Sequence, residues 1–142
     1  MTDDADTITS LPSGGGAAPV RMFASGAVIT LPPGTTLQAV ADELAGDQIG
    51  LIVLGSPGDV EAVISERDVV RAVAEGLDPL DTPARAMAST NIVWCDETAT
   101  VNEVAAVMMA EYVRHVLLED DGQLVGIVSA RDVLGAYTMA AV

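Results

Sequence analysis

The sequence predicts an α+β protein in which one β-α-β-β-α unit is used twice, and three observations lead to this fold class. The chain matches itself at an offset of 64 residues, so that ISERDVV at 64–70 aligns with VSARDVL at 128–134. Apolar runs of strand length and helical periodicities recur in the same order in both copies. Half of the chain is hydrophobic, which favours a packed core over disorder.

Each copy is expected to start with a short apolar strand and a helix, and to continue with an apolar hairpin that leads into a second helix. Thr100 and Glu103 have the spacing of a capping box, which indicates where one helix begins. Turn residues, including glycine and aspartate, separate the two strands of each hairpin. The predicted strands and helices are 28–31, 36–45, 51–54, 60–64 and 66–75 in the first copy, and 92–95, 100–111, 116–118, 124–128 and 130–139 in the second.

The repeat also predicts the domain organisation. The first copy is expected to occupy 19–80 and the second 81–142, with residues 77–83 inside the link between them. Because a unit of about 60 residues buries too little surface to be stable alone, we expect the two apolar sheet faces to pack together about an approximate twofold axis. Residues 1–18 form an acidic, glycine-rich tail that is expected to be disordered, with 14–18 as a flexible joint.

Composition excludes several classes of function. The formal net charge is −15, with 21 acidic residues and six basic ones, all of which are arginine. Such a surface repels nucleic acid and anionic membranes, and no apolar run approaches the roughly 18 residues of a membrane helix. The only cysteine, Cys95, leaves no intrachain disulfide and no Cys-only metal site. The acidic N-terminus lacks the apolar segment of a secretory signal, so a cytoplasmic location is expected.

The repeated phrase Ser-x-Arg-Asp, at 65–68 and 129–132, stands where a strand is expected to end and a helix to begin. Helix capping is one interpretation, and it accounts for the serine and the aspartate. It does not account for Arg67 and Arg131, because a cation in the first turn of a helix is slightly unfavourable. An anion held at the helix N-terminus would reverse the sign of that interaction. Hydroxyl, carboxylate and guanidinium groups together fit a ribose phosphate.

The pattern GIVSARD at 126–132, inside a duplicated β-α-β-β-α unit, resembles the CBS domain. From residue 19 to residue 142 the chain resembles a stand-alone pair of CBS domains, known as a Bateman module. The resemblance also rests on the Pro-x-Arg lead-in of each copy and on Arg114-His115 before a strand. It implies two clefts between the repeats that bind adenosine nucleotides: AMP, ADP, ATP or relatives such as S-adenosylmethionine or NAD(H).

The same resemblance implies a role for individual residues. The carboxylates of Asp68 and Asp132 would hold the ribose hydroxyls, with Ser65 and Ser129 beside the ribose or the phosphate. The base would contact Val63 and Ile127 together with the first strands at Thr30 and Trp94, and the phosphate would contact Arg114 and His115, with Arg67 and Arg131 adding charge.

The first copy departs from the family pattern at two places. Ala62 stands where the second copy has Gly126, and Gly50 with Leu51 replaces the basic pair Arg114-His115. Two unequal sites are therefore expected, with the second copy binding better.

The expected function is a regulatory module that senses an adenine nucleotide, forms a homodimer and acts on an enzyme or a transporter. We expect no catalysis, no resident cofactor and no metal, because the sequence shows no nucleophile–base constellation and no glycine-rich phosphate loop. The alternative is a ligand-free dimerisation or docking module in which the repeated phrase is helix capping only. In that case His115 is a packed or surface residue. Cys95 is expected to be an inert thiol, and Trp94 either a core residue or a stacking face.

Overall fold

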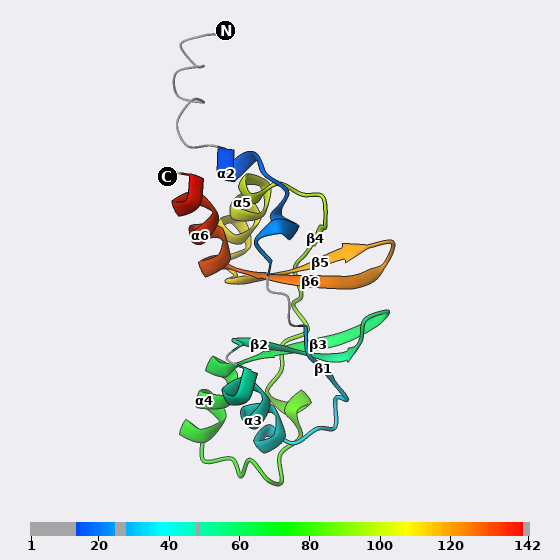
Figure 1. Cartoon of the computed structure of the whole chain (residues 1–142). Helices are drawn as coiled ribbons and strands as arrows, with labels where there is room; N and C mark the ends of the chain where they lie inside the picture. The colour runs from blue at the N-terminus through cyan, green and yellow to red at the C-terminus, as the bar shows by residue number, and fades with distance from the viewer. Residues whose placement is uncertain (1–13, 25–27, 48, 141–142) are drawn as a thin grey trace, which may run out of the picture. The chain divides into compact units, whose positions relative to one another are not determined.

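The computed structural model describes residues 14–24, 28–47 and 49–140, and its contacts divide the chain into two compact units (Figure 1). Each unit contains one three-stranded sheet and the helices that pack on it. We name them the copy-1 unit and the copy-2 unit after the repeat that supplies the sheet. Of the described residues, the copy-1 unit takes 28–47, 49–92 and Asp121–Leu124, and the copy-2 unit takes 14–24, Val93–Asp120 and 125–140.

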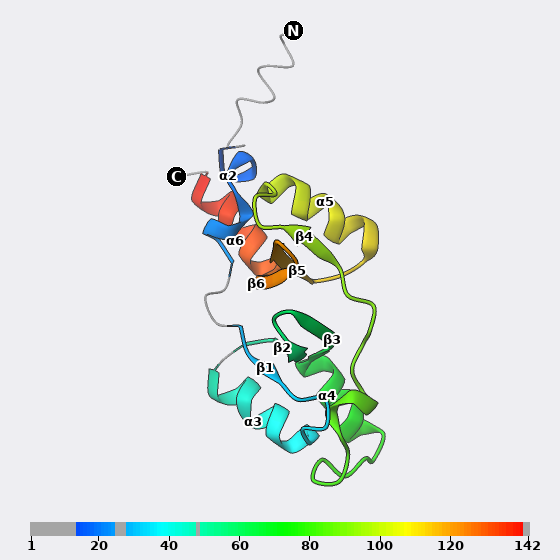
Figure 2. The same ribbon diagram turned by 90° about the vertical axis from the view of Figure 1, so that its right-hand side faces the viewer.

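The sheet of the copy-1 unit has the strand order β1-β2-β3. β1 runs parallel to β2, with Thr30 opposite Val53, and β2 runs antiparallel to β3, with Val53 opposite Val63. The helices lie on one face of this sheet in every view (Figures 1 and 2). In chain order the elements are β1 (Thr30–Leu31), α3 (Leu37–Asp47), β2 (Leu51–Ser56), β3 (Asp59–Ser65), α4 (Glu66–Ala74) and the 3-10 helix η2 (Ala84–Ala86).

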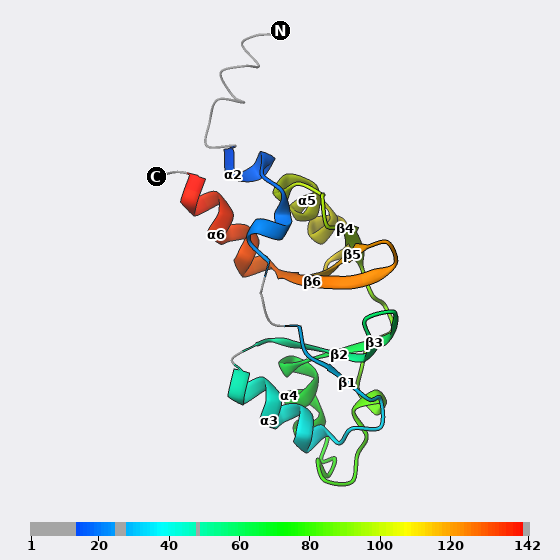
Figure 3. The ribbon, with the colours of Figure 1, turned by 45° about the vertical axis from the view of Figure 1, so that its right-hand side comes forward.

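The copy-2 unit repeats this arrangement, with the strand order β4-β5-β6 and Trp94 of β4 opposite Leu117 of β5. Its helices again lie on one face of the sheet (Figure 3). In chain order the elements are α2 (Gly14–Ala17), the 3-10 helix η1 (Val20–Met22), β4 (Trp94–Asp96), α5 (Val101–Glu111), β5 (His115–Asp120), β6 (Gln123–Ser129) and α6 (Ala130–Ala140).

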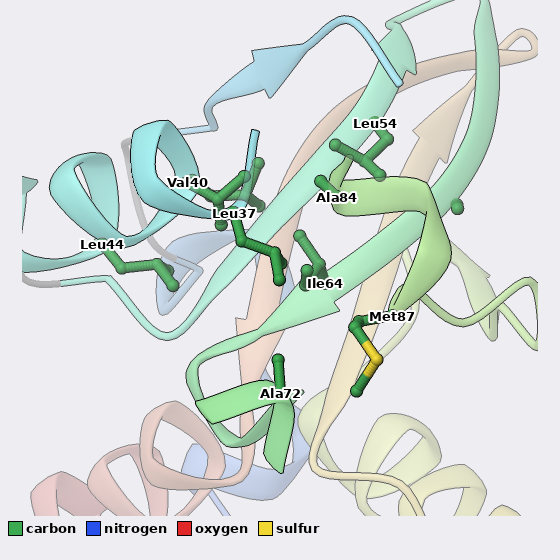
Figure 4. Packing of buried hydrophobic residues seen from close by; sticks show 10 residues of the cluster. Leu37, Val40, Leu44, Leu54, Ile64, Ala72, Ala84 and Met87 are labelled. Carbon is green, nitrogen blue, oxygen red and sulfur yellow. The ribbon is translucent and has the colours of Figure 1, made fainter. Parts of the chain in front are cut away.

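The core of the copy-1 unit lies between its helices and its sheet (Figure 4). Ile52, Leu54 and Ile64 are fully buried and share the helix-covered face of the hairpin, as the period of a strand requires, while Val53 between them is fully buried as well. Each such side chain contributes about 1.5–3 kcal/mol by leaving water. They pack against Leu37, Val40 and Leu44 of α3, Ala72 of α4, and Ala84 and Met87 around η2. The copy-2 core is equivalent and includes Val101, Val104, Val116, Leu118, Val128 and Val133.

The hairpins turn differently in the two copies. In the first, a β-bulge falls between Leu54 and Gly55, and Gly55 has a φ of 122°. A Cβ atom at Gly55 would lie 2.4 Å from the Asp59 carbonyl oxygen, so only glycine fits there. In the second, Asp121 and Gly122 have φ values of 52° and 79°, as a two-residue type I′ turn requires.

The lead-ins of the two repeats are exchanged. The lead-in of the first copy packs in the copy-2 unit, where Val20 is fully buried and its N–H donates to the Ala99 carbonyl oxygen at 2.8 Å. The lead-in of the second copy packs in the copy-1 unit, where Ala84 is fully buried and its N–H donates to the Thr35 carbonyl oxygen at 2.6 Å. The compact units therefore cut across the repeat boundaries predicted at 19–80 and 81–142.

The expectation of a flexible joint over 14–18 is wrong, because Gly14–Ala17 form the helix α2, which packs on α5 and α6. At Gly16 a Cβ atom would overlap the end of the Asn102 side chain, which would have to move. The predicted tail at 1–13 lies outside the described residues.

The predicted strands and helices are confirmed with small shifts at their ends. The first strand is shorter than 28–31, although the Ile29 carbonyl oxygen still accepts from the Val53 N–H at 3.0 Å. The linker at 77–83 also helps to begin α3, because Pro79 and Thr82 carbonyl oxygens accept from the N–H groups of its first turn. The approximate twofold packing of the repeats stays a prediction.

Replacing Leu54 by alanine tests the core. Leu54 is fully buried, so Leu54→Ala should lower the free energy of unfolding by about 2–5 kcal/mol in urea denaturation. Leu80→Ala is the matched control, because the Leu80 side chain is 67% exposed, and it should change that free energy by no more than about 0.5 kcal/mol. Equal effects of the two substitutions would contradict the described core.

Candidate functional site

The junction between β6 and α6 is held by two reciprocal hydrogen bonds. The Asp132 N–H donates to Ser129 Oγ at 3.0 Å, and the Ser129 N–H donates to Asp132 Oδ2 at 2.8 Å. The serine thereby caps the first turn of α6, and the aspartate is fixed against the last residue of the sheet. Only one carboxylate oxygen, Oδ2, takes part in this cap.

The junction between β3 and α4 has the same design. The Asp68 N–H donates to Ser65 Oγ at 3.2 Å, and the Ser65 N–H donates to Asp68 Oδ2 at 2.8 Å. In this copy the Ser65 hydroxyl also donates to Asp68 Oδ2, at 3.0 Å. The capping interpretation of the repeated phrase is thus confirmed in both copies. Capping leaves the second oxygen of each aspartate for other contacts.

The basic pair of the second copy lies at the α6 junction. The Ala130 N–H donates to the Arg114 carbonyl oxygen at 2.8 Å, so the chain just before β5 lies beside the first turn of α6. Arg114 is exposed and His115 is half-buried. In the first copy the Glu66 N–H donates to the Gly50 carbonyl oxygen at 3.2 Å. The structure therefore places the Arg114 backbone beside the start of α6, with His115 next to it in the sequence, and the first copy has Gly50 at the position equivalent to Arg114.

The remaining predicted residues are divided between the helix starts and the sheets. Arg67 and Arg131 are exposed in the first turns of α4 and α6. Thr30 and Val63 both lie level with Val53, one on each side of it, so their side chains share the sheet face opposite to the core. Ile127 precedes the core residue Val128, so its side chain lies on the face of the copy-2 sheet opposite to the core. Trp94 is paired with Leu117 and lies on this same face.

The structure also shows a partner of Val63 that the sequence did not suggest. The Val63 N–H donates to the Ser89 carbonyl oxygen at 2.9 Å, and the Ser89 N–H donates back at 2.8 Å. The chain after η2 therefore pairs with this edge of β3. The N–H of Val63 is therefore already engaged with Ser89.

The replacement of glycine by Ala62 in the first copy is not a steric obstacle. Ala62 is buried in the core of its unit. At the equivalent Gly126, a Cβ atom would lie 3.5 Å from the nearest Leu118 atom, which is ordinary van der Waals contact.

A different feature separates the copies: Arg71 pairs with Asp68 at 3.3 Å, and Gly135 stands at the equivalent position in α6. Sequence reasoning missed Arg71, although its i,i+3 spacing from Asp68 was a usable signal.

Three further kinds of feature bear on function: a reactive thiol, a metal site and a membrane-spanning helix. Cys95 is half-buried, and burial together with the nearby Glu103 carboxylate raises the pKa of its thiol, which keeps it protonated and unreactive. Across the part of the chain that the structure describes, no group of three or more His, Cys, Asp or Glu residues is placed to hold a metal ion. Within the same residues, no helix is long and apolar enough to cross a membrane.

Comparison with known proteins matches the CBS domain at residues 20–75 and again at 84–138. A CBS-domain protein from Pyrobaculum aerophilum, solved in complex with AMP, is 34% identical, with a TM-score of 0.74 over 85% of this chain and 98% of that chain. A CBS-domain protein from Agrobacterium tumefaciens is 31% identical, with a TM-score of 0.76 over 86% of this chain and 95% of that chain. A protein of Methanopyrus kandleri is 32% identical over 110 residues, which are 75% of this chain and 56% of that protein.

The duplicated β-α-β-β-α fold with a capped strand-to-helix junction in each copy defines the class of protein as a paired-repeat α+β module. The chain belongs to the CBS-domain family and carries two CBS domains. It spans little more than half the length of the Methanopyrus kandleri relative.

Proposed function

We propose that the second CBS domain binds an adenosine nucleotide, AMP or a close relative, at the start of α6, and that this binding regulates a partner protein. The observation that carries the proposal is the way the cap holds Asp132. Its Oδ2 accepts from the Ser129 N–H, which fixes the direction of the carboxylate. Oδ1 then accepts from the ribose hydroxyls of the nucleotide, in a charge-assisted hydrogen bond of about 1.5–3 kcal/mol.

The surroundings of Asp132 suit the phosphate. The N–H groups of the first turn of α6 and its helix dipole favour an anion at this end. The Arg114 carbonyl oxygen accepts a hydrogen bond from this turn, and Arg131 is one of the residues of the turn. Two of the six basic residues of a chain with net charge −15 are therefore gathered at one helix start, with His115 adjacent in sequence.

Support for the nucleotide also comes from the relatives. The Pyrobaculum aerophilum protein, which is 34% identical over 85% of this chain, was solved with AMP. We assign the nucleotide the role of a regulatory ligand and no chemical step, because the candidate site holds a carboxylate, a hydroxyl and cations without an activated nucleophile. The regulated partner is proposed to be an enzyme or a transporter, and the site needs no resident cofactor.

A second candidate function, docking of a second copy of the chain, is favoured by an apolar groove between α5 and α6. The groove has a volume of about 330 Å³. Two of its large side chains are exposed, Met109 at 78% and Leu134 at 66%. The lining of the groove includes no carboxylate, so a second acidic copy of the chain is not repelled by it. Self-association is therefore more favourable at the groove than at the acidic parts of the surface. The lining residues are Ala105, Met108, Met109, Val113, Ala130, Val133, Leu134 and Tyr137.

Calorimetric titration with AMP tests the nucleotide proposal. Asp132→Ala should weaken AMP binding roughly 10- to 150-fold, since it removes a charge-assisted hydrogen bond of about 1.5–3 kcal/mol. Asp68→Ala should have a smaller effect. Because Asp132→Ala also removes part of a helix cap, Glu103→Ala is the matched control: it removes the equivalent half of the α5 cap, the bond from the Thr100 N–H to Glu103 Oε1, and leaves the candidate site unchanged.

The nucleotide proposal predicts unchanged AMP affinity for Glu103→Ala, even where both variants lower the melting temperature. It is contradicted if AMP does not bind the parent protein, if Asp132→Ala and Glu103→Ala bind equally well, or if Asp68→Ala costs more affinity than Asp132→Ala.

Sedimentation of Leu134→Glu tests the docking surface. The parent chain should sediment as a dimer and Leu134→Glu as a monomer, because dimerisation would bury the new carboxylate without a partner. Val70→Glu is the control, since Val70 is the repeat equivalent in α4 and is also 66% exposed. A monomeric parent, or equal dissociation by both substitutions, would contradict docking at the groove.

A further inference from the structure

The two candidate carboxylates differ in what already holds them. In the first copy both oxygens of Asp68 are engaged: Oδ2 accepts from the N–H and the hydroxyl of Ser65, and Oδ1 lies 3.3 Å from Arg71 Nη1. In the second copy Gly135 occupies the position equivalent to Arg71 and has no side chain to reach Asp132. Arg71 and Gly135 have the same i,i+3 spacing from the aspartate of their helix.

Arg71 is held from more than one side. Besides Asp68, its guanidinium lies 3.8 Å from Glu75 Oε2 and donates from Nη2 to the Met87 carbonyl oxygen at 3.5 Å. Met87 is buried against the copy-1 core just after η2, so this acceptor belongs to a different element from α4. The exchanged lead-in therefore helps to keep the guanidinium over the carboxylate.

We propose that Arg71 is a built-in occupant of the first site: it takes the carboxylate oxygen that a ribose hydroxyl would need, and so leaves one competent nucleotide site per chain. This inference rests on the proposed function of the equivalent Asp132. A ribose hydroxyl would have to compete with this guanidinium for Asp68 Oδ1, and a hydrogen bond from a charged donor is the stronger of the two.

The rest of the first junction acts in the same direction. Glu66 stands at the first position of α4, where α6 has Ala130, and its carboxylate satisfies the helix dipole that a phosphate would otherwise meet. The donors of Arg71 are directed to two carboxylates and a carbonyl oxygen, and a phosphate would have to compete with these for the guanidinium. In the first copy the Glu66 carboxylate thus takes the place of the ligand's phosphate, and the Arg71 guanidinium takes the place of its ribose hydroxyls.

The reciprocal substitution Gly135→Arg tests this role on the second site. A Cβ atom at Gly135 meets nothing within 4 Å, and replacing a helical glycine raises helix propensity, so the variant should fold. An arginine there has the spacing to Asp132 that Arg71 has to Asp68. AMP affinity measured by calorimetry should fall about tenfold or more. Gly135→Gln, which has a long side chain without charge, should bind AMP as the parent does.

The outcomes separate this inference from the proposed function. Equal AMP affinity of Gly135→Arg and Gly135→Gln overturns the role of Arg71, while Asp132→Ala still tests the site itself. If the parent does not bind AMP, the proposed function fails and Arg71→Gly decides the inference. AMP binding that is gained on removing Arg71 supports it, and no binding by Arg71→Gly overturns it.

Discussion

At the end of β6 the Ser129 N–H donates to Asp132 while the Asp132 N–H donates to Ser129, and this pair of hydrogen bonds ties the sheet to the first turn of α6. Because the strand and the helix share this junction, the direction of the helix, the position of its N-terminal N–H groups and the direction of the carboxylate are set together. The Arg114 carbonyl oxygen binds the same turn, which adds the start of β5 to the arrangement. The candidate site is thus a product of secondary-structure capping.

Capping and ligand binding therefore do not compete as explanations of the repeated phrase. The cap uses Oδ2 of the aspartate, and the remaining oxygen can be used differently in each copy. In the first copy Arg71 takes it, and Glu66 supplies the negative charge at the helix start. In the second copy glycine and alanine stand at those two positions. A duplicated fold can in this way keep one stabilising motif and assign it two roles.

Much of this could be predicted from the sequence, since each strand and helix has a local signal: strand-length apolar runs, the Thr100–Glu103 spacing and the serine–aspartate phrase. The exchange of lead-ins could not, because the offset of 64 residues aligns Val20 with Ala84 without showing which core each enters. Helix α2 was missed because glycine favours disorder unless tertiary contacts compensate, as the packing beside Asn102 does here. The repeat does not point to Arg71, because Gly135 stands at the equivalent position of the second copy.

The most direct test is a two-dimensional ¹H–¹⁵N NMR titration of the labelled protein with AMP, because the backbone amides of both caps are reporters within one molecule. The account predicts that the amide signals of Ser129 and Asp132 shift and saturate as AMP is added, while those of Ser65 and Asp68 keep their positions. Saturating shifts confined to Ser65 and Asp68, or no shift at either cap, would contradict it.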